Sequence, residues 1–191
     1  MDNISVEIEV SARHIHLSRD DYNFLFGEDS DFKIVKQLSQ EGEFATDKKV
    51  KVIGPEGSIE ARFLGPFRKK TQLELSTTDC FEIGISAPYA IEVSEEAAEI
   101  KLAGKEAEIR RNCAIIARRH LHCNPKEAKK HNFTPGQLLD LTIKTERGGV
   151  IYSDVVVRIA DHYRMRVHLD TDEGNAAGIT EQSKGILTLE K

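Results

Sequence analysis

The feature that most constrains this chain is a short histidine pattern that occurs twice. The first copy reads Ser-Ala-Arg-His-Ile-His over residues 11–16, and the second reads Ala-Arg-Arg-His-Leu-His over residues 117–122. In each copy one aliphatic residue separates two histidines, and Arg13 aligns with Arg119. A pattern that repeats within one chain indicates two copies of one structural unit, so we expect two related halves.

A second correspondence lies downstream in each half. Without a gap, residues 64–85 align with residues 158–179, and the alignment matches a leucine, a threonine and a Gly-Ile pair. In this register Glu74 falls on His168. Each half therefore contains a His-x-His pair and one further metal-type ligand on a later segment.

Length and composition exclude several classes of protein. The chain has 191 residues, which is too short for a (β/α)₈ barrel of about 250 residues. Its hydrophobic content of 39% is sufficient for a core, and its net charge of −5 argues against a broad basic surface for nucleic acid. The sequence contains no run of 18 apolar residues and no signal-peptide pattern at residues 1–11, so we expect neither a membrane span nor export.

Cysteine usage and missing motifs narrow the chemistry further. The 3 cysteines, Cys80, Cys113 and Cys123, are scattered and odd in number, which fits a reducing cytosol better than a disulfide framework. Gly-x-Gly-x-x-Gly, Walker and Gly-x-Ser-x-Gly patterns are absent from the sequence, which argues against the commonest nucleotide-binding and serine-hydrolase classes.

The polar and apolar pattern favours strands with short helices between them. Alternation predicts strands over residues 5–11, 71–76, 138–144, 150–160 and 163–170, and a hairpin over residues 48–65 that turns at residues 54–57. Helices are expected after the caps Ser18 and Asn124, and over residues 171–178. Many short strands in two similar halves indicate a mainly β fold of two small barrels or sandwiches. We place the halves at residues 1–94 and 95–191, joined within the acidic stretch 86–105.

The repeated histidines point to metal binding. Residues two apart on a strand project from one face, so His14 with His16, and His120 with His122, can each hold one ion. Neutral imidazole suits zinc, and the third ligand usually comes from another element. Glu74 and His168 lie on the polar faces of their strands and are the candidates for it. Three protein ligands would leave an open position, as a catalytic metal site requires.

Among the remaining polar residues, Arg68 is the candidate anion-binding group. It begins the run Arg68-Lys69-Lys70 shortly before Glu74, and a guanidinium matches the geometry of phosphate. A solvated basic turn is the alternative interpretation of this run. Arg13 and Arg119 point away from the histidine pairs and are expected to be structural or rim residues. Cys123 is expected to pack in the core, and His131 and His162 have no assigned role.

The motifs resemble those of the PduL-type phosphotransacylases, which are phosphate propanoyltransferases. The matching stretches are SARHIHLS (11–18), FLGPFRKKTQLELSTTD (63–79), ARRHLH (117–122) and VVVRIADHYRMRVHLDTDEGNAAG (155–178). The resemblance implies two helix-capped β-barrels, with the N-terminal strand (residues 1–10) pairing in the second. It also implies two zinc ions per chain. One would be held by His14, His16 and Glu74, the other by His120, His122 and His168.

The activity that this resemblance implies is acyl transfer between CoA and phosphate in propanediol degradation. Acyl-CoA, with propanoyl-CoA as the expected substrate, and phosphate would give acyl phosphate and CoA. Arg68 matches the phosphate-binding arginine of the family. The implied partners are these small molecules, with no nucleic acid and no membrane, in a cytoplasmic enzyme. The sequence leaves a homodimer and an association with a microcompartment open, although it shows no N-terminal targeting extension.

The sequence departs from the family pattern after Ile85. Relatives usually read a Pro-x-Arg-x-Ser-Gly-like stretch there, whereas residues 87–92 read Ala-Pro-Tyr-Ala-Ile-Glu, so an arginine is missing near Ala90. Two alternatives therefore stay open. The chain could be a metal-dependent hydrolase of thioesters or phosphoesters, or a homologue that binds metal or CoA and has lost activity.

Overall fold

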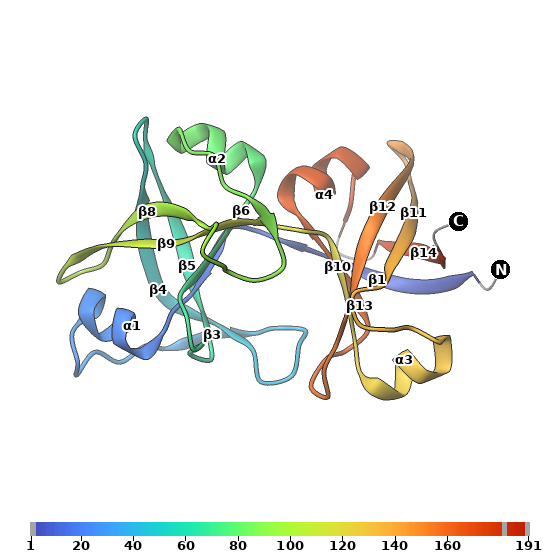
Figure 1. The fold of residues 1–191 in the computed structure, drawn as a ribbon, viewed down its shortest axis with the longest axis horizontal. Helices are drawn as coiled ribbons and strands as arrows, with labels where there is room; N and C mark the ends of the chain where they lie inside the picture. Colours follow the sequence, from blue (N-terminus) through green and yellow to red (C-terminus); the bar gives the residue numbers. More distant parts are fainter. Residues whose placement is uncertain (1–2, 181–182, 190–191) are drawn as a thin grey trace. The chain divides into compact units, whose positions relative to one another are not determined.

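The structure is a computed structural model that describes residues 3–180 and 183–189 (Figure 1). Within these ranges no helix has the length and apolar character needed to cross a membrane. The helices are α1 (Arg19–Phe26), α2 (Thr77–Ile83), α3 (Pro125–His131) and α4 (Thr171–Ala177). The strands are β1 (Ile4–Ser11), β2 (His14–His16), β3 (Ile34–Gln37), β4 (Phe44–Ile53), β5 (Ser58–Gly65), β6 (Gln72–Leu75), β7 (Tyr89–Ala90), β8 (Ala98–Ala103), β9 (Glu108–Ala117), β10 (His120–Cys123), β11 (Leu138–Thr145), β12 (Gly148–Ile159), β13 (Arg166–Asp170) and β14 (Lys184–Leu189).

The chain folds into two compact units, one of which is residues 12–117. In this unit the strands close into a barrel in the order β4-β5-β2-β6-β9-β8, with β8 pairing back onto β4. β3 extends the sheet beside β4, and β7 pairs with β9. Inside the barrel Tyr22 of α1 contacts a group of phenylalanine rings that includes Phe63. Closure of the barrel gives nearly every strand a partner on each side.

The other unit combines the described residues of 1–11 and 118–191. It is a closed barrel in the order β1-β13-β10-β12-β11-β14, with β14 pairing back onto β1. Figure 1 shows the blue strand β1 among the orange and red strands of this barrel. The alternation predicted for β1 is observed, because Val6 and Ile8 are buried in the core of this unit.

The two barrels are built on the same plan. Starting from β4 and from β11, the cyclic orders are β4-β5-β2-β6-β9-β8 and β11-β12-β10-β13-β1-β14, and each neighbouring pair has the same parallel or antiparallel sense in both. β1 therefore occupies in its barrel the place that β9 occupies in the other. Since β1 precedes β2 and β9 precedes β10, the repeats have exchanged their first strands.

This exchange determines where the chain divides. We expected the halves to divide between residues 94 and 95, whereas the chain passes from one unit to the other after Ser11 and again after Ala117. The reason is that β8 and β9, which lie after residue 94, pair with β4 and β6. The acidic stretch that we interpreted as a join contains β8 and is part of a barrel.

The helices follow their capping residues. Ser18 caps α1 and Asn124 caps α3, as the sequence predicts, and α4 begins after Asp170. The sequence analysis missed α2, which Ser76 caps in a reciprocal box with Asp79. The fold class is confirmed: the protein is mainly β, with short helices and two closed barrels related by an internal repeat.

The strand exchange makes a prediction about stability. Ile8 of β1 is 4% exposed in the core of the barrel that contains β13 and β14. Ile8→Ala is expected to lower the free energy of unfolding by about 2–5 kcal/mol in chemical denaturation, because it leaves a cavity. The backbone amide protons of β13 and β14 should then become less protected from hydrogen exchange.

Ile34→Ala is the matched control, because Ile34 is 51% exposed on β3. It is expected to change the free energy of unfolding by less than about 0.5 kcal/mol. Loss of protection in β2, β5 and β6 after Ile8→Ala, with β13 and β14 unchanged, would contradict the exchange.

Candidate metal centres

The first cluster is formed by two adjacent antiparallel strands. His14 and His16 lie on β2, and Glu74 lies on β6 directly opposite His14. The His14 Nε2 atom is 3.5 Å from Oε2 of Glu74, and ligand atoms of all three residues lie within 4.8 Å of one another. Both histidines are buried, and the Glu74 side chain is 15% exposed. Three sequence-predicted ligands are thus brought together.

Main-chain carbonyls orient both imidazoles of this cluster. Nδ1 of His14 donates to the carbonyl oxygen of Ala12 at 2.8 Å, and Nδ1 of His16 donates to that of Leu64 at 3.2 Å. A carbonyl can only accept, so each Nδ1 carries a proton, and in the neutral form of each ring Nε2 is the nitrogen that presents a lone pair. This is the outer hydrogen bond that metal-binding histidines typically make.

The carboxylate of Glu74 is also held from outside the cluster. Its Oε1 accepts a hydrogen bond from Nε2 of Gln72 at 2.8 Å, and Oε1 of Gln72 accepts from the main-chain N–H of Val93 at 2.8 Å. Oε2 is the oxygen that faces His14. The alternation predicts Gln72 on the same face as Glu74, but nothing in the sequence singles it out.

For Glu74 and His16, the charges of the first cluster favour the protonation states of metal ligands. Burial disfavours the Glu74 carboxylate, but the charge and hydrogen bond of His14 outweigh it, and the pKa of Glu74 lies well below its usual range. Burial would lower the pKa of His14, but Glu74 raises it overall. Burial and then the charges of His14 and Arg68 hold the pKa of His16 well below its ordinary value. Glu74 is therefore anionic and His16 neutral.

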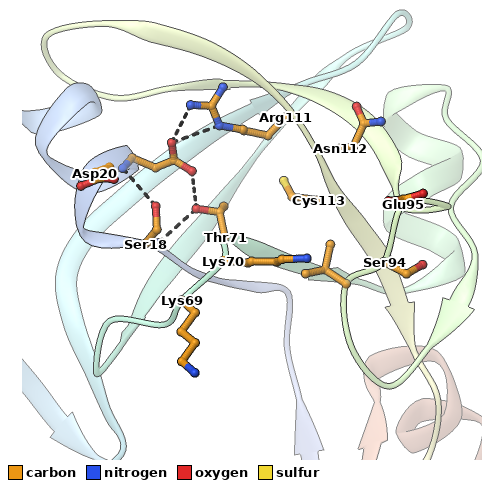
Figure 2. A pocket seen from close by; sticks show the side chains of 12 residues that line it. Ser18, Asp20, Lys69, Lys70, Thr71, Ser94, Glu95, Arg111, Asn112 and Cys113 are labelled. Carbon is orange, nitrogen blue, oxygen red and sulfur yellow. Dashed lines mark hydrogen bonds and ion pairs between the residues drawn. The ribbon is translucent and has the colours of Figure 1, made fainter.

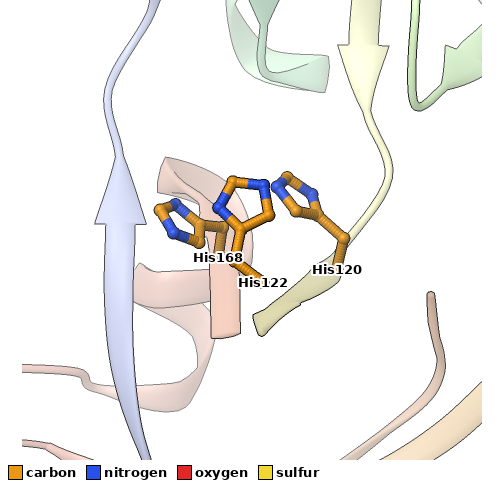
Figure 3. Close-up of side chains that lie close together, drawn as sticks. All are labelled: His120, His122 and His168. Atoms are coloured by element: carbon orange, nitrogen blue, oxygen red, sulfur yellow. The ribbon is translucent and has the colours of Figure 1, made fainter. Parts of the chain in front are cut away.

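The second cluster repeats this arrangement with three histidines (Figure 3). His120 and His122 lie on β10, and His168 lies on β13 directly opposite His120. All three ring centroids lie within 5.2 Å of one another. Nδ1 of His120 donates to the carbonyl oxygen of Arg118 at 2.8 Å, as His14 does in the first cluster. Ser11 Oγ lies 3.5 Å from Nδ1 of His168.

Tyr163 covers one side of the second cluster. Its ring stacks on that of His122 with centroids 3.8 Å apart and planes 11° from parallel. The loop that carries Tyr163 is attached to β10, because the N–H of Ala160 donates to the carbonyl oxygen of Cys123. The sequence analysis missed this contact, which arises from the fold of a loop and has no periodic signal.

Arg68 lies in the loop between β5 and β6. Its side chain is 35% exposed, and its Nη2 is 3.7 Å from Oε1 of Glu43. The main-chain N–H of Arg68 donates to the carbonyl oxygen of Leu17 at 2.9 Å, so this loop is attached to the chain directly after His16. An anion bound by Arg68 would therefore lie near this cluster.

Arg13 and Arg119 hold helices, in agreement with the structural role expected for them. Arg13 Nε lies 3.3 Å from a carboxylate oxygen of Asp79, and Arg119 Nε lies 2.6 Å from one of Glu173. Asp79 and Glu173 occupy the same position in the capping boxes of α2 and α4. The same arginine–carboxylate ion pair therefore occurs in both units, where it connects a short helix to the residue that precedes the His-x-His strand.

The other sequence-predicted residues lie apart from the clusters. His131 ends α3, His162 lies in a turn beside Tyr163, and neither joins a group of three metal-type ligands in the described ranges. Ala90 pairs with Ala117 in the short contact between β7 and β9.

A cavity of about 490 Å³ lies in the unit of the first cluster (Figure 2). Polar groups of its lining hydrogen-bond to one another: the buried Asp21 accepts from the buried Thr71 at 2.5 Å and from two guanidinium nitrogens of the more exposed Arg111. Lys69 and Lys70 also line it, together with Asp20 and Glu95 of opposite charge. The cavity therefore has a mixed polar lining without a clear preference for one charge.

Cys113 and Cys123 are unsuited to nucleophilic catalysis. Burial, and then the charge of Asp21, raise the pKa of Cys113 to about 12. Burial, and then the charge of Glu127, raise that of Cys123 to about 11. Cys123 packs in the core, as expected. A reactive cysteine has a lowered pKa and an accessible sulfur, and these two have neither.

Comparison with known proteins identifies the family. The family model for phosphate propanoyltransferases matches residues 7–180. Phosphate propanoyltransferase of Alkaliphilus metalliredigens is 39% identical over 185 residues, covering 95% of this chain and 87% of the relative. That of Thermotoga maritima is 37% identical, covering 89% and 82%. The chain belongs to the phosphate propanoyltransferase family, and it is therefore an acyltransferase of the phosphotransacylase type.

The thiol chemistry gives a prediction. In a Cys80→Ser variant, Cys113 and Cys123 are expected not to react with a disulfide reagent at pH 8, because a thiol with a raised pKa stays protonated until the pH approaches that value. The absorbance of the thiolate that is released from the reagent measures the number of reacting thiols. Both should react after denaturation, and rapid reaction in the native protein would contradict the burial described here.

Proposed function

We propose that the chain transfers an acyl group reversibly between CoA and phosphate, with acyl-CoA and phosphate giving acyl phosphate and CoA. Propanoyl-CoA is the expected substrate, because the relatives carry that acyl group in their name. The observation that carries the proposal is the pair of repeat-related clusters, each with three convergent ligand atoms, together with Arg68, whose main chain is bonded to Leu17 next to His16. That the enzyme is cytoplasmic, and that it could form a homodimer, stay predictions from the sequence.

We assign one zinc ion to each cluster. The donor sets, two histidines with a carboxylate and three histidines, are those that zinc accepts in catalytic sites. The fit is supported by His14 and His120, whose Nδ1 atoms donate to main-chain carbonyls and whose Nε2 atoms are thereby available. When bound, zinc would polarise the thioester carbonyl and stabilise the charge on its oxygen and on the departing thiolate.

The chain's own residues have the following roles in the proposed reaction. Arg68 binds phosphate and directs one of its oxygens at the carbonyl carbon of the thioester. That oxygen forms the new C–O bond, and the C–S bond breaks with its electron pair leaving on sulfur as CoA thiolate. Phosphate is itself the nucleophile, which agrees with the buried and protonated thiols of Cys113 and Cys123.

Dependence on phosphate tests the reaction. With propanoyl-CoA, the purified zinc-loaded protein is expected to release CoA thiol and form acyl phosphate only when phosphate is present. Thiol release and trapping of acyl phosphate by hydroxylamine measure the two products, over a panel of short acyl-CoA substrates. Equal thiol release without phosphate would identify a hydrolase, and no product from any substrate in the panel would identify an inactive homologue.

Arg68→Ala tests the anion-binding group. Loss of charge-assisted hydrogen bonds of about 1.5–3 kcal/mol is expected to lower kcat/KM for phosphate roughly 10–100-fold or more, with KM for acyl-CoA changed much less. Initial rates over a range of phosphate concentrations give both constants, and metal content should stay at the wild-type value. Lys69→Ala, which removes a neighbouring charge, is the control, and an equal loss there would contradict a specific role.

Metal content tests the two centres separately. Elemental analysis of the purified chain is expected to give close to two zinc ions, because each cluster offers three ligands. His14→Ala and His168→Ala are each expected to lower this to close to one ion and to abolish turnover, since a missing ligand weakens one centre only. Retention of two ions by both variants would contradict the assigned ligands.

A further inference from the structure

Gln72 has both ends of its amide engaged, and it lies beside a proposed metal ligand. It begins β6, two residues before Glu74, so both side chains project from the same face of the strand. Gln72 is only 4% exposed. Its Nε2 donates to Oε1 of Glu74 and its Oε1 accepts from the N–H of Val93, both at 2.8 Å.

These two hydrogen bonds fix the direction of the amide. The main-chain N–H of Val93 can only donate, so it requires the amide oxygen of Gln72 on its side. The NH₂ group of Gln72 is then directed at Glu74. Val93 belongs to a loop outside the barrel strands, so main chain outside β2 and β6 anchors the orientation of this carboxylate.

A carboxylate ligand has a rotational freedom that an imidazole held at Nδ1 does not have. The terminal torsion of glutamate is broad, and its two oxygens are equivalent until something distinguishes them. The donor on Oε1 distinguishes them here, because it leaves Oε2 as the oxygen 3.5 Å from Nε2 of His14. Glu74 is thereby prepared to bind through one oxygen before any ion arrives.

The repeat supplies an internal comparison. The position that matches Gln72 in the other barrel is Arg166, which forms an ion pair with Glu7 at 2.5 Å, and Glu7 is not a member of the histidine cluster. The third ligand there is His168, whose two ring nitrogens are not equivalent, and its Nδ1 lies 3.5 Å from Oγ of Ser11. A neutral amide donor thus occurs at the cluster whose third ligand is a carboxylate.

We propose that Gln72 is the positioning residue of the first metal centre, where it holds Glu74 as a ligand through one oxygen. This inference rests on the assignment of a metal ion to that cluster. Outer hydrogen bonds to metal ligands typically change metal affinity 10–100-fold. Loss of the Gln72 donor should therefore weaken one of the two ions by about that factor and leave the other unchanged.

The experiment is a zinc titration of the full chain in competition with a coloured chelator, which gives the affinity of each centre. Gln72→Met removes both hydrogen bonds at similar volume, and it is expected to weaken one ion about 10–100-fold. Gln72→Glu keeps the shape but has no amide donor when ionised, and it should show a loss at the same centre. Arg166→Met is the matched control and should keep the wild-type affinity for both ions.

Thermal unfolding of the metal-free chain separates positioning from general stability. The proposal predicts a one-centre loss of affinity in a variant whose metal-free unfolding temperature is close to that of the wild type. Unchanged affinity in both Gln72 variants, or equal weakening of both centres, would overturn it. If the wild-type chain binds no zinc at all, the proposed function fails as well, whereas two tight ions in the Gln72 variants would overturn this inference alone.

Discussion

The candidate site depends on the register between a short two-histidine strand and the strand antiparallel to it. His14 lies opposite Glu74 in one barrel, and His120 lies opposite His168 in the other. Because side chains alternate between the faces of a strand, a slip of one residue would move a whole set of ligands to the other face. The aliphatic residue between the histidines of each pair is completely buried, and this burial opposes such a slip.

Much of the fold could be predicted from local patterns, and the exceptions have physical reasons. Strands with clear alternation and helices with strong caps, such as those after Ser18 and Asn124, are where the sequence indicates them. α2 was missed because its sequence is short and rich in β-branched residues, so its capping box at Ser76 matters more than helix propensity. The exchange of β1 and β9 could not be predicted from the polar and apolar alternation. Alternation shows that a strand has a buried face, but it does not show which barrel buries that face.

The positions of the candidate ligands were predictable because they repeat, whereas the groups that contact them were not. Two His-x-His pairs and a matched third residue identify the six predicted ligands, and the structure brings them together in two groups of three. Gln72 and Tyr163 act through contacts that only the folded loops create. The two clusters thus lie on equivalent strands but have different neighbouring groups: a carboxylate bonded to an amide in one, and an imidazole stacked on a tyrosine in the other.

The most direct test of this account is anomalous X-ray scattering from crystals of the zinc-loaded protein, measured on both sides of the zinc absorption edge. The account predicts one anomalous peak at each cluster, at about 2.0–2.1 Å from the Nε2 atoms of the histidines. A structure with no peak at either cluster, or with zinc bound only by other residues, would contradict it.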